Sequence, residues 1–327
     1  MQQVKIATGT YRGQEVTNQV FTLVKDVTAG TKGHFITVRP NTEIGQGKDK
    51  IRVTIVSHDH VEYITEEVES DEAIMERIGE RFDILTEMTS ATTDGSIRSM
   101  IVTGAAGIGK SYGIIEELKK CSIMDIMRNG DVKYEIVKGS STAIGLYSTL
   151  YNNSDKDSVL VFDDCDSVFY DDVSLNLLKA ALDTTGKRNL SWTSASKYLE
   201  KEGIPSVFQF KGSIIFVTNL NFDNIKSAKL QEHLTALMSR CHYLDLTIAT
   251  TREKFLRIKQ IYRTGALFKK CGLTTEQEEE IITWIEKNKE TVRELSLRLA
   301  IKCAELCSLQ SSIGWQRMAE VTLCKNR

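Results

Sequence analysis

The chain has 327 residues, 41% of them hydrophobic and 26% charged, so it is long enough for two or three domains and too long for a peptide hormone. No run of 18 apolar residues is present that could span a membrane, and the first residues have neither the basic nor the apolar region of a secretory signal. The seven cysteines are scattered without a CxxC spacing, so they indicate neither a disulfide framework nor a zinc ribbon. The formal net charge of −2 gives no overall attraction to nucleic acid, so any contact with DNA must be local.

The first part of the chain has the pattern of a β domain. Short β-rich runs separated by Gly, Asn and Thr turns fill residues 1–66, and we predict a small antiparallel barrel or sheet of about five strands. From Ser70 the apolar residues recur every three or four positions, which predicts a linker helix over 67–95.

The remainder divides into two further predicted domains. Over 96–250, continuous apolar runs alternate with helical segments, which indicates an α/β domain whose parallel sheet is covered on both faces. Over 251–327 the strand patterns disappear, and capping patterns at Thr250–Glu253 and Thr275–Glu278 predict successive helices.

The strongest motif is GAAGIGKS, from Gly104 to Ser111, which follows an apolar run and opens a helical segment. Its glycines allow backbone N–H groups to surround phosphate oxygens, Lys110 supplies a positive charge, and Ser111 offers a hydroxyl to Mg²⁺. The motif predicts an ATP site.

Two later strands end in polar side chains. Asp163 and Asp164 close the apolar run that begins at Val159, and we predict that Asp163 holds Mg²⁺ and Asp164 polarises the attacking water. The role of Asp166, two residues after Asp164, is more ambiguous. Asn219 closes the run from Ser213, at the sheet edge where the phosphates are expected, and could orient that water. Arg240 ends a helical segment, where a cation can simply cap its own helix.

Taken together, these motifs resemble the AAA+ ATPase family over about four fifths of the chain. GAAGIGKS looks like Walker A, LVFDD like Walker B, Asn219 like sensor 1, Arg240 like an arginine finger of the SRC type, and Arg298 like sensor 2. The resemblance implies an AAA+ core with a parallel five-stranded sheet and a helical lid. It also implies that ATP is bound by residues along Walker A and by the lid, namely Gly104, Ala105, Ala106, Gly107, Ile108, Gly109, Lys110, Ser111, Tyr112 and Arg298.

One residue departs from the family pattern. The second acid of Walker B is usually Glu, whereas this chain has Asp164, which is one methylene shorter. Hydrolysis is then expected to be slower or the water to be placed differently. The resemblance further implies a homo-oligomer, a hexamer or a pentamer, in which Arg240 reaches the site of a neighbouring subunit.

About thirty residues separate the helix ending near Asp183 from the sensor 1 strand, more than a direct connection needs. The segment has two β-like pieces that predict a hairpin, similar to the pre-sensor 1 insertion of some AAA+ proteins. Lys187, Arg188 and Trp192 would suit a pore that grips DNA. The alternative is a surface loop whose Trp192 packs on its own domain.

These features favour an ATPase, hydrolysing ATP to ADP and phosphate, that acts as a motor or remodeller on DNA or a protein–DNA complex. A protein-remodelling chaperone, with a client recruited by the N-terminal domain, and a nucleotide-switched assembly factor with slow turnover are the alternatives. Cations and an aromatic of the N-terminal domain fit nucleic-acid contact and an ordinary solvated surface equally: Tyr11, Arg12, Lys48, Lys50 and Arg52. An AAA+ core with a short β domain in front of it resembles ATPases encoded by tailed bacteriophages. A phage-encoded protein is expected in the host cytoplasm.

Overall fold

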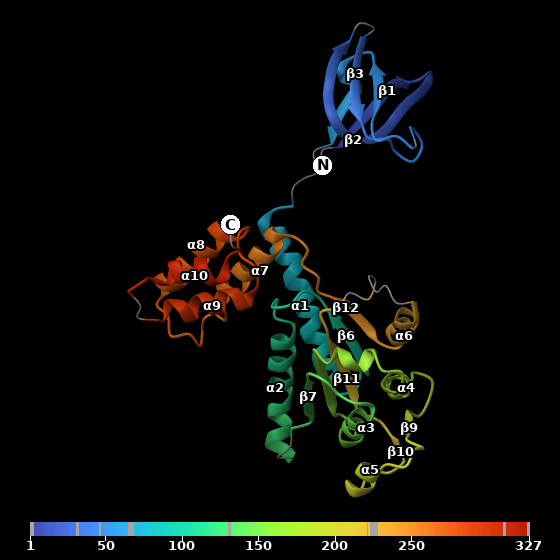
Figure 1. The fold of residues 1–327 in the computed structure, drawn as a ribbon, viewed down its shortest axis with the longest axis vertical. Helices are drawn as coiled ribbons and strands as arrows, with labels where there is room; N and C mark the ends of the chain where they lie inside the picture. The colour runs from blue at the N-terminus through green and yellow to red at the C-terminus, as the bar shows by residue number, and fades with distance from the viewer. Residues whose placement is uncertain are drawn as a thin grey trace. The chain divides into compact units, whose positions relative to one another are not determined.

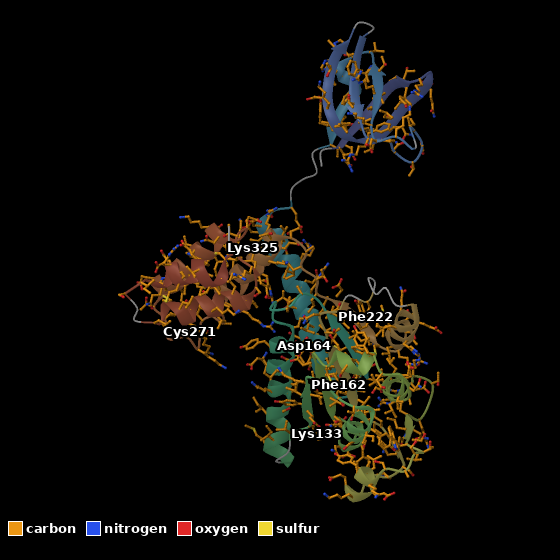
Figure 2. All side chains as sticks on the ribbon, viewed as in Figure 1. Lys133, Phe162, Asp164, Phe222, Cys271 and Lys325 are labelled. Carbon is orange, nitrogen blue, oxygen red and sulfur yellow. The ribbon has the colours of Figure 1, made fainter. Side chains whose placement is uncertain are left out.

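The computed structural model describes residues 3–30, 33–45, 47–64, 69–129, 132–220, 222, 228–309 and 312–325. The chain divides into two compact units, Met1–Ser70 and Asp71–Arg327. The first unit consists mainly of β-strands, and the second combines a sheet with helices (Figure 1). Side chains of the second unit crowd around its sheet and between its C-terminal helices (Figure 2). Among the described residues, none of the helices has the length and apolar character needed to cross a bilayer.

The first unit is an antiparallel sheet that closes on itself. It comprises β1 Gln3–Tyr11, β2 Gln14–Gly30, β3 Gly33–Val38, β4 Ile51–Ile55 and β5 Val61–Ile64, with a 3₁₀ turn at His58–His60. The order is β2-β3-β4-β1-β5, and β1 also pairs with β2, which completes the ring. Between β1 and β2, Arg12 and Gly13 have φ values of 53° and 85°, as in the I′ turn that suits the twist of a hairpin. The predicted five-stranded β domain is confirmed.

The second unit contains the predicted five-stranded parallel sheet. Its strands are β6 Ser99–Thr103, β7 Tyr134–Lys138, β8 Val159–Asp163, β11 Ser213–Val217 and β12 His242–Asp245. They follow the order β12-β6-β11-β8-β7, and each pairing is parallel. The three central strands β6, β8 and β11 are buried along their whole length, which explains their unbroken apolar sequences.

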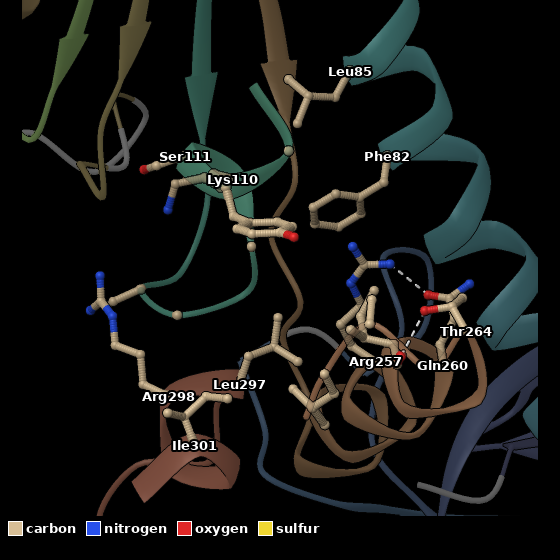
Figure 3. A pocket seen from close by; sticks show the side chains of 18 of the residues that line it. Phe82, Leu85, Lys110, Ser111, Arg257, Gln260, Thr264, Leu297, Arg298 and Ile301 are labelled. Atoms are coloured by element: carbon tan, nitrogen blue, oxygen red, sulfur yellow. Dashed lines mark hydrogen bonds between the residues drawn. The ribbon is translucent and has the colours of Figure 1, made fainter. Parts of the chain in front are cut away.

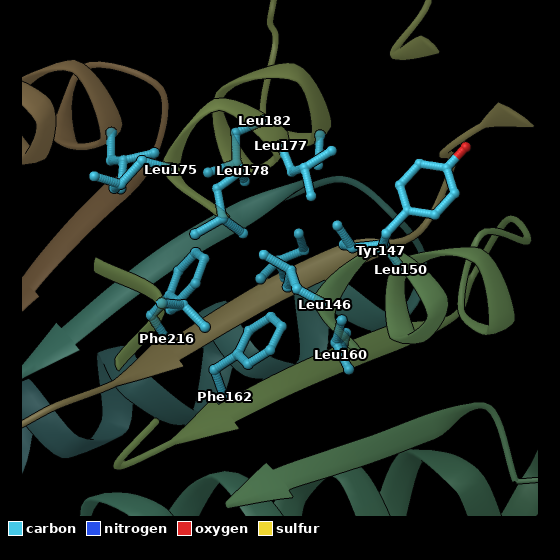
Figure 4. Close-up of a cluster of buried hydrophobic side chains, with 14 of the residues drawn as sticks. Leu146, Tyr147, Leu150, Leu160, Phe162, Leu175, Leu177, Leu178, Leu182 and Phe216 are labelled. Carbon is cyan, nitrogen blue, oxygen red and sulfur yellow. The ribbon is translucent and has the colours of Figure 1, made fainter. Parts of the chain in front are cut away.

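Helices cover both faces of this sheet, and successive residues of each strand point to opposite faces. On one face, Val161 and Ile215 pack with residues of α1 Asp71–Thr93 and α2 Lys110–Asn129. On the other, Phe162 and Phe216 pack with leucines of the remaining helices (Figure 4). Those helices are α3 Ala143–Asn152, α4 Asp172–Ala181 and α6 Ala228–Met238, with a 3₁₀ turn at Asp166–Phe169.

The helix α1 is part of the second unit. Ile74, Ile78 and Leu85 are at most 4% exposed and belong to the same hydrophobic cluster as the sheet. The Gln260 side-chain amide donates to the Met75 carbonyl at 2.9 Å and so joins α1 to the C-terminal helices. Residues 65–68, where the predicted linker begins, lie outside the described ranges.

The C-terminal helices form a small domain with its own core. They are α7 Thr251–Arg263, α8 Thr275–Asn288, α9 Leu297–Cys307 and α10 Trp315–Leu323. Phe255, Trp284 and Cys303 are buried between them. The capping box at Thr250–Glu253 is confirmed. The second box lies at Thr274–Gln277, one residue before the predicted pair, because Thr274 is the residue that keeps an extended backbone.

The predicted hairpin insertion is present. β9 Asn189–Ser191 pairs antiparallel with β10 Val207–Gln209, and α5 Lys197–Lys201 lies between them in the sequence.

The assignment of Arg188 to a DNA-gripping surface is wrong. Arg188 is 7% exposed and donates hydrogen bonds to the carbonyls of Ala181 and Gly212, at 3.3 and 2.9 Å. Trp192 is half-buried against Tyr147, with ring centroids 5.7 Å apart. A buried, hydrogen-bonded guanidinium cannot contact a phosphate backbone. Of the three residues, Lys187 is the one that is exposed.

Candidate nucleotide site

The Walker A segment forms the loop between β6 and α2, as the sequence predicts. Its conformation depends on glycine: Gly107 has φ of 70°, and a Cβ there would lie 2.8 Å from the Ser296 Cβ. The loop ends at the N-terminus of α2, where free backbone N–H groups favour an anion. Within the loop, Ile108 does not face the cleft, because its side chain is 3% exposed in the core beside the sheet.

Lys110 fills the inside of this loop. Its ammonium donates to the carbonyls of Gly104 and Ala105 at 2.7 and 2.9 Å and to Asn219 Oδ1 at 2.8 Å. Burial lowers the pKa of Lys110 to about 8, although the nearby carboxylate of Asp164 opposes the shift. A buried ammonium held only by neutral oxygens can exchange those partners for phosphate oxygens, since the latter carry charge.

Ser111 and Asp163 lie together at the sheet edge. The Ser111 hydroxyl donates to Asp163 Oδ1 at 2.6 Å, and the Asp163 residue is 4% exposed. A hydroxyl and a carboxylate are the hard oxygen ligands that Mg²⁺ prefers, so the pair fits the predicted metal position. The second carboxylate oxygen of Asp163 lies 2.8 Å from the ammonium of Lys138, at the end of β7. Lys138 was not predicted, and only the parallel register Lys138↔Asp163 places it there.

Asp164 and Asn219 face each other beside Lys110. The Asn219 Nδ2 amide donates to Asp164 Oδ1 at 3.0 Å, while its oxygen accepts from Lys110. Asp164 has φ of 52°, a left-handed backbone that turns the chain sharply after β8. Asp166 Oδ1 is buried with no hydrogen-bond partner among the described groups, and burial raises the pKa of this carboxyl. The structure thus brings together Lys110, Asp164 and Asn219, which are far apart in the sequence.

The helical domain closes the other side of a cleft of about 850 Å³, a size that suits a nucleotide. The backbone N–H of Leu297 donates to the Gly107 carbonyl at 2.9 Å, so α9 begins directly against the Walker A loop. Arg298 follows in the sequence and lines the cleft, as the resemblance implies. Tyr112 also lines it and is 60% exposed.

The lining of the cleft includes an arginine that the sequence did not single out. The Arg257 guanidinium lies 3.4 Å from the centroid of the Phe82 ring and donates to Gln260 Oε1 at 2.7 Å (Figure 3). It is 7% exposed, and burial lowers its pKa to about 10, so it stays charged at neutral pH. No sequence motif marks Arg257, because Phe82 and Arg257 meet only when α1 packs on α7.

Arg240 lies away from this cleft in the single chain. Its Nη1 donates to the Ala236 carbonyl at 2.6 Å and to Ser239 Oγ at 3.5 Å, which caps the end of α6. Its backbone carbonyl accepts from Ser99 Oγ at 3.0 Å and so fixes the helix end to β6. A role in the site of a neighbouring subunit therefore stays a prediction.

Comparison with known proteins gives one strong relative and several distant structures. No family model matches the chain. It is 40% identical, over 266 residues, to an uncharacterized 36.7 kDa protein from the nrdC–mobD intergenic region of Enterobacteria phage T4. The match covers 81% of this chain and 79% of the phage protein.

The solved structures are similar at low identity. ORC2 of Aeropyrum pernix, in ADPNP–ADP complexes, is 13% identical with a TM-score of 0.45, covering 76% of this chain and 68% of ORC2. Trip13 of Rhizobiales is 10% identical with a TM-score of 0.35, covering 79% and 95%. Since these values are low, the AAA+ fold is best recognised in the parallel sheet, the Walker A loop and the helical domain themselves.

Proposed function

Because this chain belongs to the family of the uncharacterized 36.7 kDa protein of phage T4 and has an AAA+ fold, we propose that it hydrolyses ATP to ADP and phosphate and uses the energy to move or remodel DNA or a protein–DNA complex. A helicase, a helicase loader and a clamp-loader-like factor all fit this description, and the host cytoplasm is the proposed location. The observation that carries the ATPase proposal is the meeting of Lys110, Asp164 and Asn219 at one point of the cleft.

Each polar group of the cleft has a distinct proposed task. Lys110 binds the β- and γ-phosphates, and Arg298 holds the nucleotide from the lid side. Ser111 and Asp163 would hold Mg²⁺, which neutralises phosphate charge when bound. Asp164 accepts a proton from the attacking water, and Asn219 keeps its carboxylate turned toward that water.

The test of the Asp164 assignment is Asp164→Asn. The amide keeps the shape of the side chain but cannot accept the proton, so turnover should fall at least tenfold while the affinity for ATP stays within threefold of wild type. Steady-state phosphate release and titration with a fluorescent ATP analogue measure the two quantities. Unchanged turnover would remove Asp164 from this role and direct attention to Asp166.

We propose that hydrolysis takes place at interfaces of a homo-oligomer, a hexamer or pentamer, with Arg240 completing the site of the next subunit. Arg240→Ala should then lose most of its turnover and keep its ATP binding. Mixing it with Lys110→Ala should restore activity, because the second variant still supplies an intact Arg240. If mixing restores nothing, Arg240 serves only as the cap of α6 that the single chain shows.

The DNA-acting part of the proposal has its own experiment. ATPase rates are measured with single-stranded DNA, with duplex DNA and without polymer, on protein whose mass is determined with ATP present. Stimulation by DNA supports a motor or loader. A rate indifferent to both forms contradicts it and favours a protein client recruited by residues 1–66.

A second candidate is an assembly factor that switches with the nucleotide and turns over slowly. The observation in its favour is Asp164, whose side chain is one methylene shorter than that of Glu and accepts a hydrogen bond from Asn219. This candidate predicts that assembly follows ATP binding and that Asp164→Glu raises turnover severalfold. An Asp164→Glu protein with wild-type turnover would count against it.

A further inference from the structure

Two aromatic rings of the first unit each lie beside cations. Arg12 Cζ and Lys48 Nζ are both 5.8 Å from the centroid of the Tyr11 ring, although 36 positions separate the two cations in the sequence. Arg52 Cζ lies 5.1 Å from the centroid of the Phe35 ring. Both rings are half-buried and all three cations are exposed, so the rings form a floor and the cations reach solvent.

The sheet register brings these two groups to one end of the sheet, where Tyr11 packs against the edge of the interior cluster and Phe35 lies on the outer side. Thr54 of β4 pairs with Thr10 of β1 on one side and with Phe35 of β3 on the other. In β4, Arg52 and Thr54 are exposed while the alternate residues are buried, so both point outward. Arg12 follows Thr10 by two residues, in the turn after β1, and Arg52 precedes Thr54 by two, so antiparallel pairing sets the two arginines at the same end of the sheet.

The charge of this face is positive, and among the described residues no ion pair neutralises it. Lys50 is exposed beside Lys48 and Arg52 in the sequence. Within the described part of the unit, no ion pair engages Arg12, Lys48, Lys50 or Arg52. By contrast, Lys5 on β1 lies 3.6 Å from Glu62. Two acids lie close by, Asp49 in the loop and Glu15 opposite Thr10. Four cations against two acids leave a net attraction for a polyanion.

We propose that this cation–aromatic face, formed by Tyr11, Arg12, Phe35, Lys48 and Arg52, binds single-stranded nucleic acid. Cations without an ion pair among the described residues suit the phosphates, and the half-buried rings suit unstacked bases. An acidic protein would use the cations but not the rings, and a duplex hides its bases. The inference extends the proposed DNA-acting function and gives the first unit the task of holding the strand.

The experiment measures binding of the full chain to a fluorescein-labelled 20-residue oligo(dT) by fluorescence polarisation at several salt concentrations. The double variant Arg12→Glu/Arg52→Glu should weaken binding at least tenfold and reduce the slope of log affinity against log salt by about 1.4, the value for two lost phosphate contacts on a single strand. Phe35→Leu should weaken it at least fivefold, because stacking is lost. The matched control is Lys5→Glu, a cation of β1 that lies five residues before Thr10 and 3.6 Å from Glu62, which should change affinity less than twofold.

Three results would overturn the inference: wild-type affinity in the double variant, an equal loss in Lys5→Glu, or equally strong competition by duplex DNA or by polyglutamate. Titration with a fluorescent ATP analogue on the same preparations separates this failure from failure of the ATPase proposal. Loss of oligonucleotide binding with normal ATP binding supports the face as a separate site. Failure of wild-type protein to bind ATP would instead contradict the nucleotide site.

Discussion

The nucleotide cleft and the hairpin insertion each contain a buried cation, and the two cations differ in what surrounds them. Lys110 and Arg188 are 5% and 7% exposed, and burial lowers the pKa of both, to about 8 and about 10. Lys110 faces a cleft and is held by oxygens that a ligand can replace. Arg188 lies over the Phe210 ring, 5.1 Å from its centroid, and is held by carbonyls inside the protein. Burial of a cation therefore does not identify a binding site, whereas access to a cleft does.

The largest expected effect separates these environments directly. Lys110→Ala removes the charge that binds the phosphates, so affinity for ATP should fall at least a hundredfold. Stability should change little, because the vacated loop opens to water. Titration with a fluorescent ATP analogue measures the loss, and Lys119→Ala is the control on the same helix, since Lys119 pairs with Glu116 at the surface. Tight ATP binding by Lys110→Ala would contradict the whole nucleotide site.

The reverse outcome is expected in the insertion. Arg188→Met keeps much of the volume but leaves the carbonyls of Ala181 and Gly212 without their donor, which should lower the free energy of unfolding by about 2 to 3 kcal/mol. The neighbouring Lys187→Met should change it by less than about 0.5 kcal/mol, because Lys187 is exposed. Chemical denaturation measures both, and ATP affinity of folded Arg188→Met should stay within twofold. Loss of DNA binding by Arg188→Met at unchanged stability would reinstate the gripping role.

Arg257 shares one property with each of these cations: it lines the cleft, as Lys110 does, and it is as buried as Arg188. Arg257→Met loses the contact with the Phe82 ring and the hydrogen bond to Gln260, so ATP affinity should fall about tenfold if this wall contacts the base. Lys259→Met on the same helix is the control, since Lys259 does not line the cleft. A loss of stability with normal ATP affinity would show that Arg257, like Arg188, stabilises the fold and does not bind the nucleotide.

Local patterns predict those parts of the molecule that depend on neighbouring residues in the chain. The Walker A loop, the buried strands and the Thr250–Glu253 box all follow from short sequence signals. Lys138 and Arg257 could not be found in this way, because each acquires its partner only through strand register or helix packing. Arg188 was misassigned for the same reason: its sequence neighbours are polar, but its spatial neighbours are Phe210 and two carbonyls.

The smallest expected effect concerns Glu253. Like Arg188 it has hydrogen-bond partners within the protein, but these partners lie near solvent. Burial by itself would raise the pKa of Glu253, but hydrogen bonds from the Thr250 backbone and the Arg77 guanidinium outweigh it and lower the pKa to about 2. A lowered pKa in the folded state contributes stability above the ordinary value of 4.5, and this contribution disappears as the pH falls toward 2. Glu253→Gln should therefore cost about 1 kcal/mol at pH 7. The difference between variant and wild type, followed by thermal unfolding, should shrink below pH 4. A deficit that stays constant down to pH 2.5 would show that Glu253 acts through its shape and not through its charge.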